Sequence, residues 1–550
     1  MEVILSGALL YDGSGGEPYL ADVGIDEGRV RAVTASGELA SAAGRRYDLQ
    51  GLALAPGFID VHSHADADVL VCPEAPNKLM QGVTTDVVGN CGHLPVPIVD
   101  PVRPYGRYSE WLATHHPEVR WSTFAEFLQV LAEARPAIHL APLAGLNQIR
   151  AACVAPRSDA AASVNRPPTP EELHAEQRLV AEAMEAGFFG VSTGLIYAPG
   201  SYMSTAEITV LATVAVRHGG FYATHMRNEA DRLLESIEEA LSVGAASGAA
   251  VEISHLKACG VANHGKVSEA LESLARARQK GIDVACDFYP YEATSTALSA
   301  YLPPWLHDAG PAAFLQRLAD GAIRRRAARD LETGITGWEN PITANGGWHA
   351  IMIAATPDPV DHCYEGLRVD EAADQAGQEP LDFVCDLLLR QRGDVQIVAF
   401  KMAEADVAMV ANDAWASVGS DAGVASPKGP LGASKIHPRA YGTFPRVLAR
   451  YTDLAVDHPG VPLAEMIRRL SSLPAQRLHL SDRGMIRPGA WADLVAFAPA
   501  DLRDTATYQE PHRFAQGIRQ VWVDGEAAVL DGRPTGVRNG GIIYRGGQTS

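Results

Sequence analysis

Short apolar runs alternate with amphipathic stretches through the middle of the chain. Between several runs, apolar residues recur at helical spacing, as at Leu233, Leu234, Ile237 and Leu241. Strands that alternate with helices form parallel βα units, and eight such units are the number that closes a TIM barrel. The apolar runs end at Asp60, Gly89, Leu143, Thr193, His225, His255, Phe288 and Ser420. The pattern therefore predicts an α/β fold of the (β/α)8 type.

Two of the predicted helices have bounds that the sequence suggests. Thr169 is a candidate N-cap, Pro170 suits the first helical position, and Glu172 stands at the spacing of a capping box. This helix is expected to end before Gly187, because glycine commonly follows the last helical turn. A second helix is predicted over residues 228–246.

The two ends of the chain have a different pattern. Residues 1–54 and 481–550 contain short alternating segments broken by Gly and Asp, which is typical of small antiparallel strands. We expect one composite β domain built from both termini, and two unrelated β appendages are the alternative. The seventh and eighth predicted strands lie much further apart than one crossover helix requires. An inserted subdomain or lid is therefore expected over 295–395, within a barrel domain that covers 55–480.

Composition and charge narrow the class of protein. The chain of 550 residues has a formal net charge of -20, which argues against a nucleic-acid partner because such a face needs a basic stripe. The N-terminus lacks the features of a signal peptide, and no apolar run is long enough for a membrane span. The seven cysteines are few and scattered, which favours a reducing compartment. We expect a cytoplasmic protein without a membrane partner; the sequence gives no oligomeric state.

The most distinctive chemistry follows the first predicted strand. Residues two apart on a strand point to the same side, so His62 and His64 stand at metal-ligand spacing. Active sites of barrels lie at the carboxyl ends of the strands. Other strands end at or near Cys91, His225, His255 and Asp421. Each of these residues alone has an ordinary structural explanation, but together on one rim they predict a shared metal site.

A series of motifs resembles the amidohydrolase superfamily and, within it, the D-aminoacylases, which are N-acyl-D-amino-acid deacylases. The resemblance extends over essentially the whole chain. It implies a TIM barrel of the amidohydrolase type with a composite β-sandwich domain and an inserted subdomain. The motifs are Pro56–His64, Gly82–Thr85, Gly89–Gly92, Gly190–Tyr197, Thr224–Arg227, Ser254–Lys257, Asp287–Tyr291, Gly419–Asp421, His437–Arg439 and Leu473–Ala475.

The resemblance also implies a reaction and the residues that perform it. The expected activity is zinc-dependent hydrolysis of the amide bond of N-acyl-D-amino acids, which are small-molecule substrates. Cys91, His225 and His255 are implied to hold a tight Zn²⁺, with His62 and His64 forming a second, weaker site. Asp421 is implied to be the general base that takes a proton from water and passes it to the leaving amine. The implied ligands of the substrate carboxylate are Lys257, Tyr197, Tyr289, Ser295 and Arg439.

Departures from the family pattern affect the expected substrate. Residues 143–148 lack the histidine that the family usually has after the third strand, and His93 follows the Cys91 motif where a serine is expected. A hydantoinase-like hydrolase of cyclic amides is an alternative, but Ser192-Thr193-Gly194 lacks the lysine that often bridges two metals in those enzymes. A third reading is a non-catalytic metal-binding scaffold, which the presence of every ligand and the base disfavours.

Overall fold

Eight parallel strands form the centre of the molecule. The computed structural model describes residues 1–99, 108–154, 164–455, 460–547 and 549. Neighbouring strands pair in parallel, and the backbone of Ser63 bridges to Ala422, which nearly closes the barrel between its first and last strands. The strands are β6 (Phe58–Asp60), β7 (Val83–Val88), β8 (His139–Gly145), β9 (Gly190–Gly194), β10 (Phe221–His225), β11 (Val251–Ile253), β12 (Val284–Phe288) and β16 (Ala416–Val418). The predicted eight-stranded parallel barrel is thereby confirmed.

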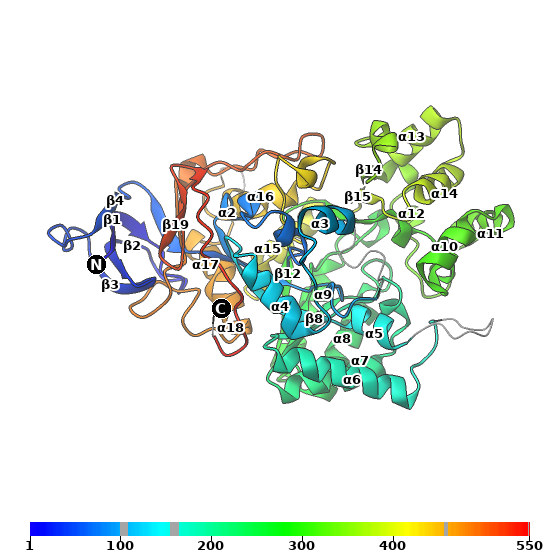
Figure 1. The fold of residues 1–550 in the computed structure, drawn as a ribbon, viewed down its shortest axis with the longest axis horizontal. Coiled ribbons are helices and arrows are strands. Elements are labelled where there is room, and N and C mark those ends of the chain that lie inside the picture. Colours follow the sequence, from blue (N-terminus) through cyan, green and yellow to red (C-terminus); the bar gives the residue numbers. More distant parts are fainter. Residues whose placement is uncertain (100–107, 155–163, 456–459, 548, 550) are drawn as a thin grey trace.

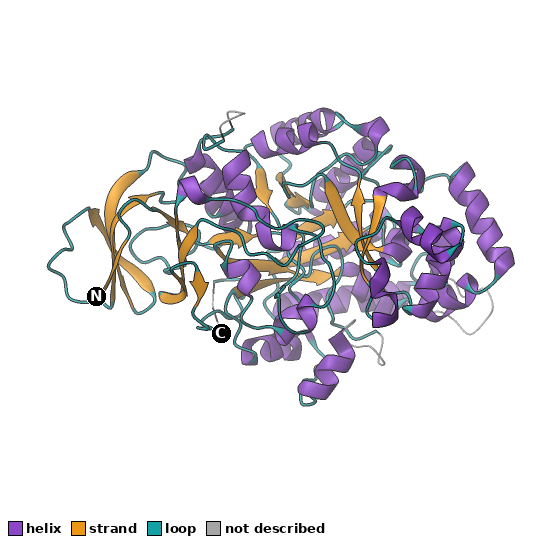
Figure 2. Cartoon of the chain, turned by 90° about the horizontal axis from the view of Figure 1, so that it is seen from above, coloured by secondary structure: helices purple, strands orange, loops and turns teal. Residues whose placement is uncertain are grey.

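Helices surround this barrel, as Figure 2 shows. They pack apolar faces onto the strands, so barrel and helices share one continuous core. The longer ones are α4 (Phe124–Glu133), α5 (Leu146–Cys153), α6 (Pro170–Glu185), α7 (Thr205–Arg217), α8 (Leu233–Ser247), α9 (Val267–Gln279), α15 (Glu404–Asn412), α16 (Arg439–Arg450) and α17 (Leu463–Leu470). Shorter helices are α1 (Asp68–Val71), α2 (Pro76–Leu79), α3 (Ser109–His115) and α18 (Ser472–Arg477).

The predicted first residue is confirmed for one of the two helices with predicted bounds and is wrong for the other. Helix α6 begins as predicted, because Thr169 and Glu172 form the reciprocal capping box at its N-terminus. Helix α8 was expected from residue 228 but begins at Leu233, so that prediction is wrong at its start. The reason is local: the Asn228 side chain accepts the backbone N–H groups of Ala230 and Arg232 and holds this segment in a turn.

Segments from both ends of the chain form one nine-stranded sheet (Figure 1). The two halves join where β17 pairs antiparallel with β5, so the termini build a single composite sheet. Its strands are β1 (Val3–Leu10), β2 (Tyr19–Asp26), β3 (Arg29–Ala35), β4 (Arg45–Asp48), β5 (Ala53–Pro56), β17 (Leu494–Phe497), β18 (Ile518–Val523), β19 (Glu526–Leu530) and β20 (Arg533–Pro534).

A third unit lies between the seventh and eighth barrel strands, at the opposite end of the molecule from this sheet (Figure 1). Its antiparallel strands are β13 (Ala293–Ala297), β14 (Ile351–Ala355) and β15 (Gln396–Phe400). Its helices are α10 (Gly310–Leu318), α11 (Gly321–Thr333), α12 (Pro341–Ala344), α13 (Val369–Ala376) and α14 (Pro380–Arg390). The unit has its own apolar core, against which Trp305, Trp338 and Trp348 pack.

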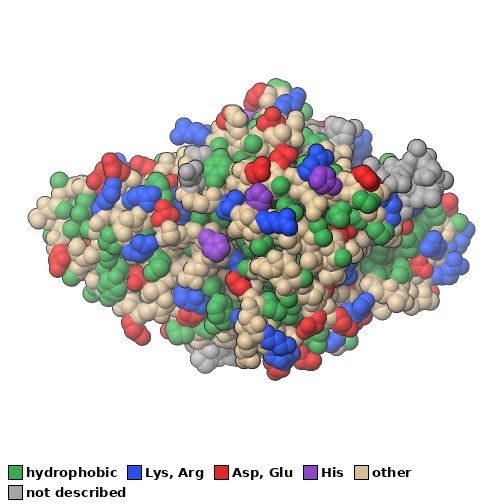
Figure 3. Space-filling view, turned by 90° about the horizontal axis from the view of Figure 1, so that it is seen from below, with side chains coloured by type: hydrophobic (Ala, Val, Ile, Leu, Met, Phe, Trp, Pro, Cys, Tyr) green, Lys and Arg blue, Asp and Glu red, His purple; other side chains and the backbone are tan. Residues whose placement is uncertain are grey.

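The surface is mixed in character. On the face shown in Figure 3, Lys and Arg side chains are interspersed with Asp and Glu. Among the described residues, no helix combines the length and the apolar composition that a membrane span needs.

Candidate metal centre

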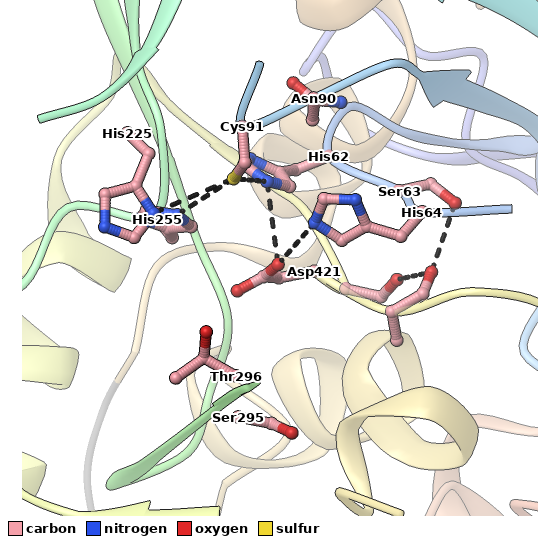
Figure 4. Close-up of polar contacts among 12 residues, drawn as sticks. His62, Ser63, His64, Asn90, Cys91, His225, His255, Ser295, Thr296 and Asp421 are labelled. Carbon is pink, nitrogen blue, oxygen red and sulfur yellow. Dashed lines mark hydrogen bonds and ion pairs between the residues drawn. The ribbon is translucent and has the colours of Figure 1, made fainter. Parts of the chain in front are cut away.

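Six predicted site residues lie together at the carboxyl ends of the barrel strands (Figure 4). His62 and His64 follow β6, and Cys91 follows β7. His225 ends β10, His255 follows β11, and Asp421 follows β16. The parallel barrel brings these ends to one rim, which explains how residues far apart in sequence meet.

The Cys91 thiol is the centre of this cluster. Its Sγ lies 3.3 Å from His62 Nε2, 3.6 Å from His255 Nε2 and 3.8 Å from His225 Nδ1. Two groups of potential metal ligands share it: His62, His64, Cys91 and Asp421 form one, and Cys91, His225 and His255 form the other. Burial opposes the thiolate, but the surrounding histidines hold the pKa of Cys91 well below its usual range. This donor set suits Zn²⁺, which binds thiolate and imidazole.

Three members of the cluster have a left-handed backbone. The φ angles of Cys91, His255 and Asp421 are 53°, 38° and 49°. A residue other than glycine in this region costs roughly 1–3 kcal/mol, and such strain is concentrated at functional sites. The fold therefore holds these side chains in place against a local backbone preference.

Asp421 lies between the imidazoles and a buried arginine. Its Oδ1 lies 3.0 Å from His64 Nε2 and 3.6 Å from His62 Nε2, and its Oδ2 lies 2.9 Å from Arg439 Nη1. Burial disfavours the charged carboxylate, but the Arg439 guanidinium and the His64 contact hold the pKa of Asp421 well below its usual range. Asp421 is therefore ionised at neutral pH.

Two carboxylates behind the histidines were missed by the sequence analysis. Glu229 Oε1 lies 3.0 Å from His255 Nδ1, and its Oε2 lies 3.6 Å from His225 Nε2. Asp287 Oδ2 lies 3.2 Å from His62 Nδ1, and its Oδ1 accepts the backbone N–H of His255 at 2.9 Å. A carboxylate at one ring nitrogen favours the tautomer that leaves the other free for a metal. The available signal was the spacing of Glu229, four residues after His225.

A cavity of about 580 Å³ opens onto the cluster. Figure 4 shows Ser295 and Thr296 across an open space from Asp421. The five residues predicted to bind a carboxylate all line this cavity: Tyr197, Lys257, Tyr289, Ser295 and Arg439.

These five residues are not equally available to a ligand. The Lys257 ammonium donates to Glu229 Oε1 at 2.7 Å and lies 2.6 Å from His255 Nδ1. The Arg439 guanidinium lies 4.6 Å from the centre of the Tyr289 ring, and its Nε is buried without a hydrogen-bond partner among the described residues. The Tyr197 hydroxyl is 2.9 Å from Thr296 Oγ1. Arg439 therefore retains more donor capacity than Lys257.

The amidohydrolase family model matches residues 45–305 and 369–529. The chain belongs to the amidohydrolase family. Three relatives of this family member come from Alcaligenes xylosoxydans xylosoxydans, and each match covers 99% of this chain. An N-acyl-D-aspartate deacylase is 34% identical over 95% of its own length. An N-acyl-D-glutamate deacylase and a D-aminoacylase are each 33% identical, over 97% and 98% of their lengths.

Solved structures of other proteins show a similar fold. A D-aminoacylase with a binuclear metal centre superposes with a TM-score of 0.78 at 31% identity, over 99% of both chains. An N-acyl-D-glutamate deacylase from Bordetella bronchiseptica, complexed with zinc and a phosphonate inhibitor, gives a TM-score of 0.77 at 30% identity and the same coverage. A D-hydantoinase matches at 14% identity with a TM-score of 0.51, which shows a shared fold alone. The resemblance to the D-aminoacylases is confirmed.

Proposed function

We propose that this protein is a zinc-dependent hydrolase that cleaves the amide bond of N-acyl-D-amino acids and releases a D-amino acid and a carboxylate. The observation that carries the proposal is the Cys91-centred cluster, which includes the ionised Asp421 and opens onto one cavity. Support comes from the relatives described above, which are named as deacylases of N-acyl-D-amino acids.

The cluster suits one tightly bound zinc ion and a weaker second site. Cys91, His225 and His255 provide three protein ligands, the number that leaves a coordination position for water in a catalytic zinc site. The depressed pKa of Cys91 favours the thiolate that such a site requires. His62 and His64 would form the second site together with Asp421, and Cys91 is the residue that the two groups share. When bound, zinc supplies an acidified water molecule and a polarised amide carbonyl.

Asp421 is the residue placed to move the proton. Its carboxylate is ionised at neutral pH, so it can accept a proton from a water molecule in the cavity beside the cluster. The protonated carboxyl group of Asp421 can then donate that proton to the amide nitrogen as the amine leaves. Arg439 and His64 keep the carboxylate oriented throughout, because each contacts one of its oxygens.

The α-carboxylate of the substrate would bind cationic and hydroxyl groups that line the cavity. Arg439 is the strongest candidate, because its Nε has no partner among the described residues, and Tyr289 stacks beneath it. Tyr197 and Ser295 supply hydroxyl groups on the same cavity. Lys257 would contribute less by direct contact, since its ammonium is already paired with Glu229.

We also place the enzyme in the cytoplasm. All seven cysteines are free, including Cys91, and a zinc ligand must stay reduced.

The test is hydrolysis of a panel of N-acetyl D- and L-amino acids by zinc-loaded protein, with hydantoins included for the cyclic-amide alternative. We expect turnover of D-substrates and at least about tenfold slower turnover of L-substrates, because inverting Cα moves the side chain from its pocket into a wall when the other two contacts are fixed. Preferential cleavage of L-substrates or of hydantoins would contradict the proposal. Metal-free protein is the control.

A further inference from the structure

Lys401 is a third buried cation that lines the cavity, in addition to Lys257 and Arg439. Lys401 follows β15 of the inserted unit, and its side chain is 7% exposed. Its ammonium donates no hydrogen bond to any residue that the structure describes. The contacts that surround it are an ion pair of 3.6 Å with Glu339 Oε1 and the Tyr301 ring, whose centre lies 5.7 Å away.

Two other lysines line the same cavity, and both ammonium groups have hydrogen-bond partners. Lys257 donates to Glu229, and Lys435 donates to the Gln509 carbonyl at 2.9 Å. Lys401 is thus the cavity lysine whose ammonium donates no hydrogen bond to any residue that the structure describes. A buried charge without hydrogen bonds is costly, so a site of this kind is completed when an anion enters.

Two hydroxyl groups on the cavity also lack hydrogen-bond partners. Tyr301 and Thr294 line the cavity, and the hydroxyl of each is buried without a hydrogen-bond partner among the described residues. Glu339 balances the lysine only in part, because its other oxygen accepts the backbone N–H of Glu229 at 3.0 Å. Burial opposes the charge on Lys401, but Cys259, Tyr301 and Glu339 around it keep its pKa well above the usual range. The ammonium is therefore charged at neutral pH.

We propose that Lys401 binds a carboxylate at the end of the substrate side chain, so that the preferred substrates are N-acyl-D-amino acids with acidic side chains. This inference rests on the proposed function and names its substrate class. The arrangement gives three contacts from three parts of the fold. The metal cluster faces the amide, Arg439 of α16 faces the α-carboxylate, and Lys401 of the inserted unit receives the side chain.

The test compares isosteric substrates that differ in one charge. We expect kcat/KM for N-acetyl-D-glutamate or N-acetyl-D-aspartate to exceed that for N-acetyl-D-glutamine or N-acetyl-D-asparagine by about ten- to a hundredfold, the range for one charge-assisted hydrogen bond. Lys401→Met should bring at least one of these ratios close to one. Lys435→Met is the matched control. It should keep the wild-type ratio, because the Lys435 ammonium already donates a hydrogen bond to the Gln509 carbonyl.

A second variant should move the ratio in the opposite direction. Glu339→Gln removes the competing negative charge, while its amide oxygen can still accept the Glu229 N–H. We expect a higher preference for acidic substrates. A lower preference would show that Glu339, and not Lys401, sets the selectivity, and it would overturn the inference. If Lys401→Met does not fold, the wild-type ratio and the Glu339→Gln ratio decide the question.

Calorimetric binding to zinc-loaded Asp421→Asn protein separates this inference from the proposed function. Tighter binding of N-acetyl-D-glutamate than of N-acetyl-D-glutamine, lost in the Lys401→Met double variant, supports the anion site even if wild-type protein hydrolyses neither compound. Equal hydrolysis of the acidic and neutral D-substrates by wild-type protein would overturn the anion site and leave the deacylase proposal standing. Absence of both binding and hydrolysis would overturn both.

Discussion

At the scale of residues, the site consists of potential metal ligands and of carboxylates that contact the imidazole rings. Cys91 belongs to both potential metal groups, and Asp421 contacts both His62 and His64. Glu229 and Asp287 lie behind the imidazoles and orient them. The meeting of these residue types at the strand ends could be predicted from the sequence. The role of Glu229 was missed, because the predicted helix includes this residue, whereas the observed helix begins four residues later.

Replacing Asp421 by asparagine tests its role in proton transfer. The amide keeps the size of the side chain but cannot accept the proton, so kcat should fall at least about a hundredfold. Zinc content should stay at the wild-type value, because the proposed ligands Cys91, His225 and His255 are unchanged. The checks are steady-state kinetics and elemental analysis of the same preparation. Activity within about tenfold of wild type would assign the proton transfer to another group.

Glu229 is predicted to be a positioning residue. Glu229→Gln removes the charge that faces both His255 and His225, and zinc affinity should fall by about ten- to a hundredfold. Competition with a chelating indicator measures this affinity directly, and saturating zinc should restore part of the activity. Glu235→Gln, which changes an exposed carboxylate on α8, is the matched control and should leave affinity unchanged. Wild-type zinc affinity in Glu229→Gln would refute the role.

At the scale of elements, the features that could be predicted from the sequence are those that depend on residues close together in the chain. The capping box of α6 and the apolar runs of the barrel strands appear where expected, since each depends on residues close together in sequence. The start of α8 could not be predicted from periodicity, because the Asn228 side chain satisfies nearby backbone N–H groups and stops the helix.

Helix α6 also contains a buried acid whose titration should affect stability. Glu176 is fully buried, and neither carboxylate oxygen has a hydrogen-bond partner among the described residues. Burial, reinforced by nearby Glu207, raises the pKa of Glu176 to about 8 from its usual 4.5. Between these pH values the folded protein holds a proton that the unfolded chain has released. The contribution of this group to stability is therefore present at low pH and lost as pH rises toward 8.

Glu176→Gln should remove this pH dependence. At pH 8 the variant should melt higher than wild type by roughly 2–4 °C, and the difference should shrink at pH 5, where the wild-type carboxyl is protonated. Thermal unfolding at both pH values makes the comparison. Glu171→Gln, at an exposed position of the same helix, should change Tm little at either pH. A lower Tm for Glu176→Gln at pH 8 would show that the carboxylate is stabilised by an interaction that burial and charge do not account for.

At the scale of the whole molecule, two of the three units form the site. The barrel supplies the metal cluster and Asp421, and the inserted unit supplies the cavity wall with Ser295 and Lys401. The strand count and the β-rich ends could be predicted from the sequence. The position of Lys401 could not, because it lies more than a hundred residues from Lys257 in the sequence and reaches the same cavity only through the tertiary fold.

The central claim is that zinc bound at Cys91, His225 and His255 makes this barrel a D-specific deacylase. Its most direct test is a zinc titration of metal-free protein, with hydrolysis of an N-acetyl-D-amino acid and of its L-enantiomer followed at each addition. Activity on the D-substrate should rise from the background to a plateau at about one zinc ion per chain, and Cys91→Ser should show no such rise. Activity that is independent of zinc, or that appears on the L-enantiomer first, would contradict the claim.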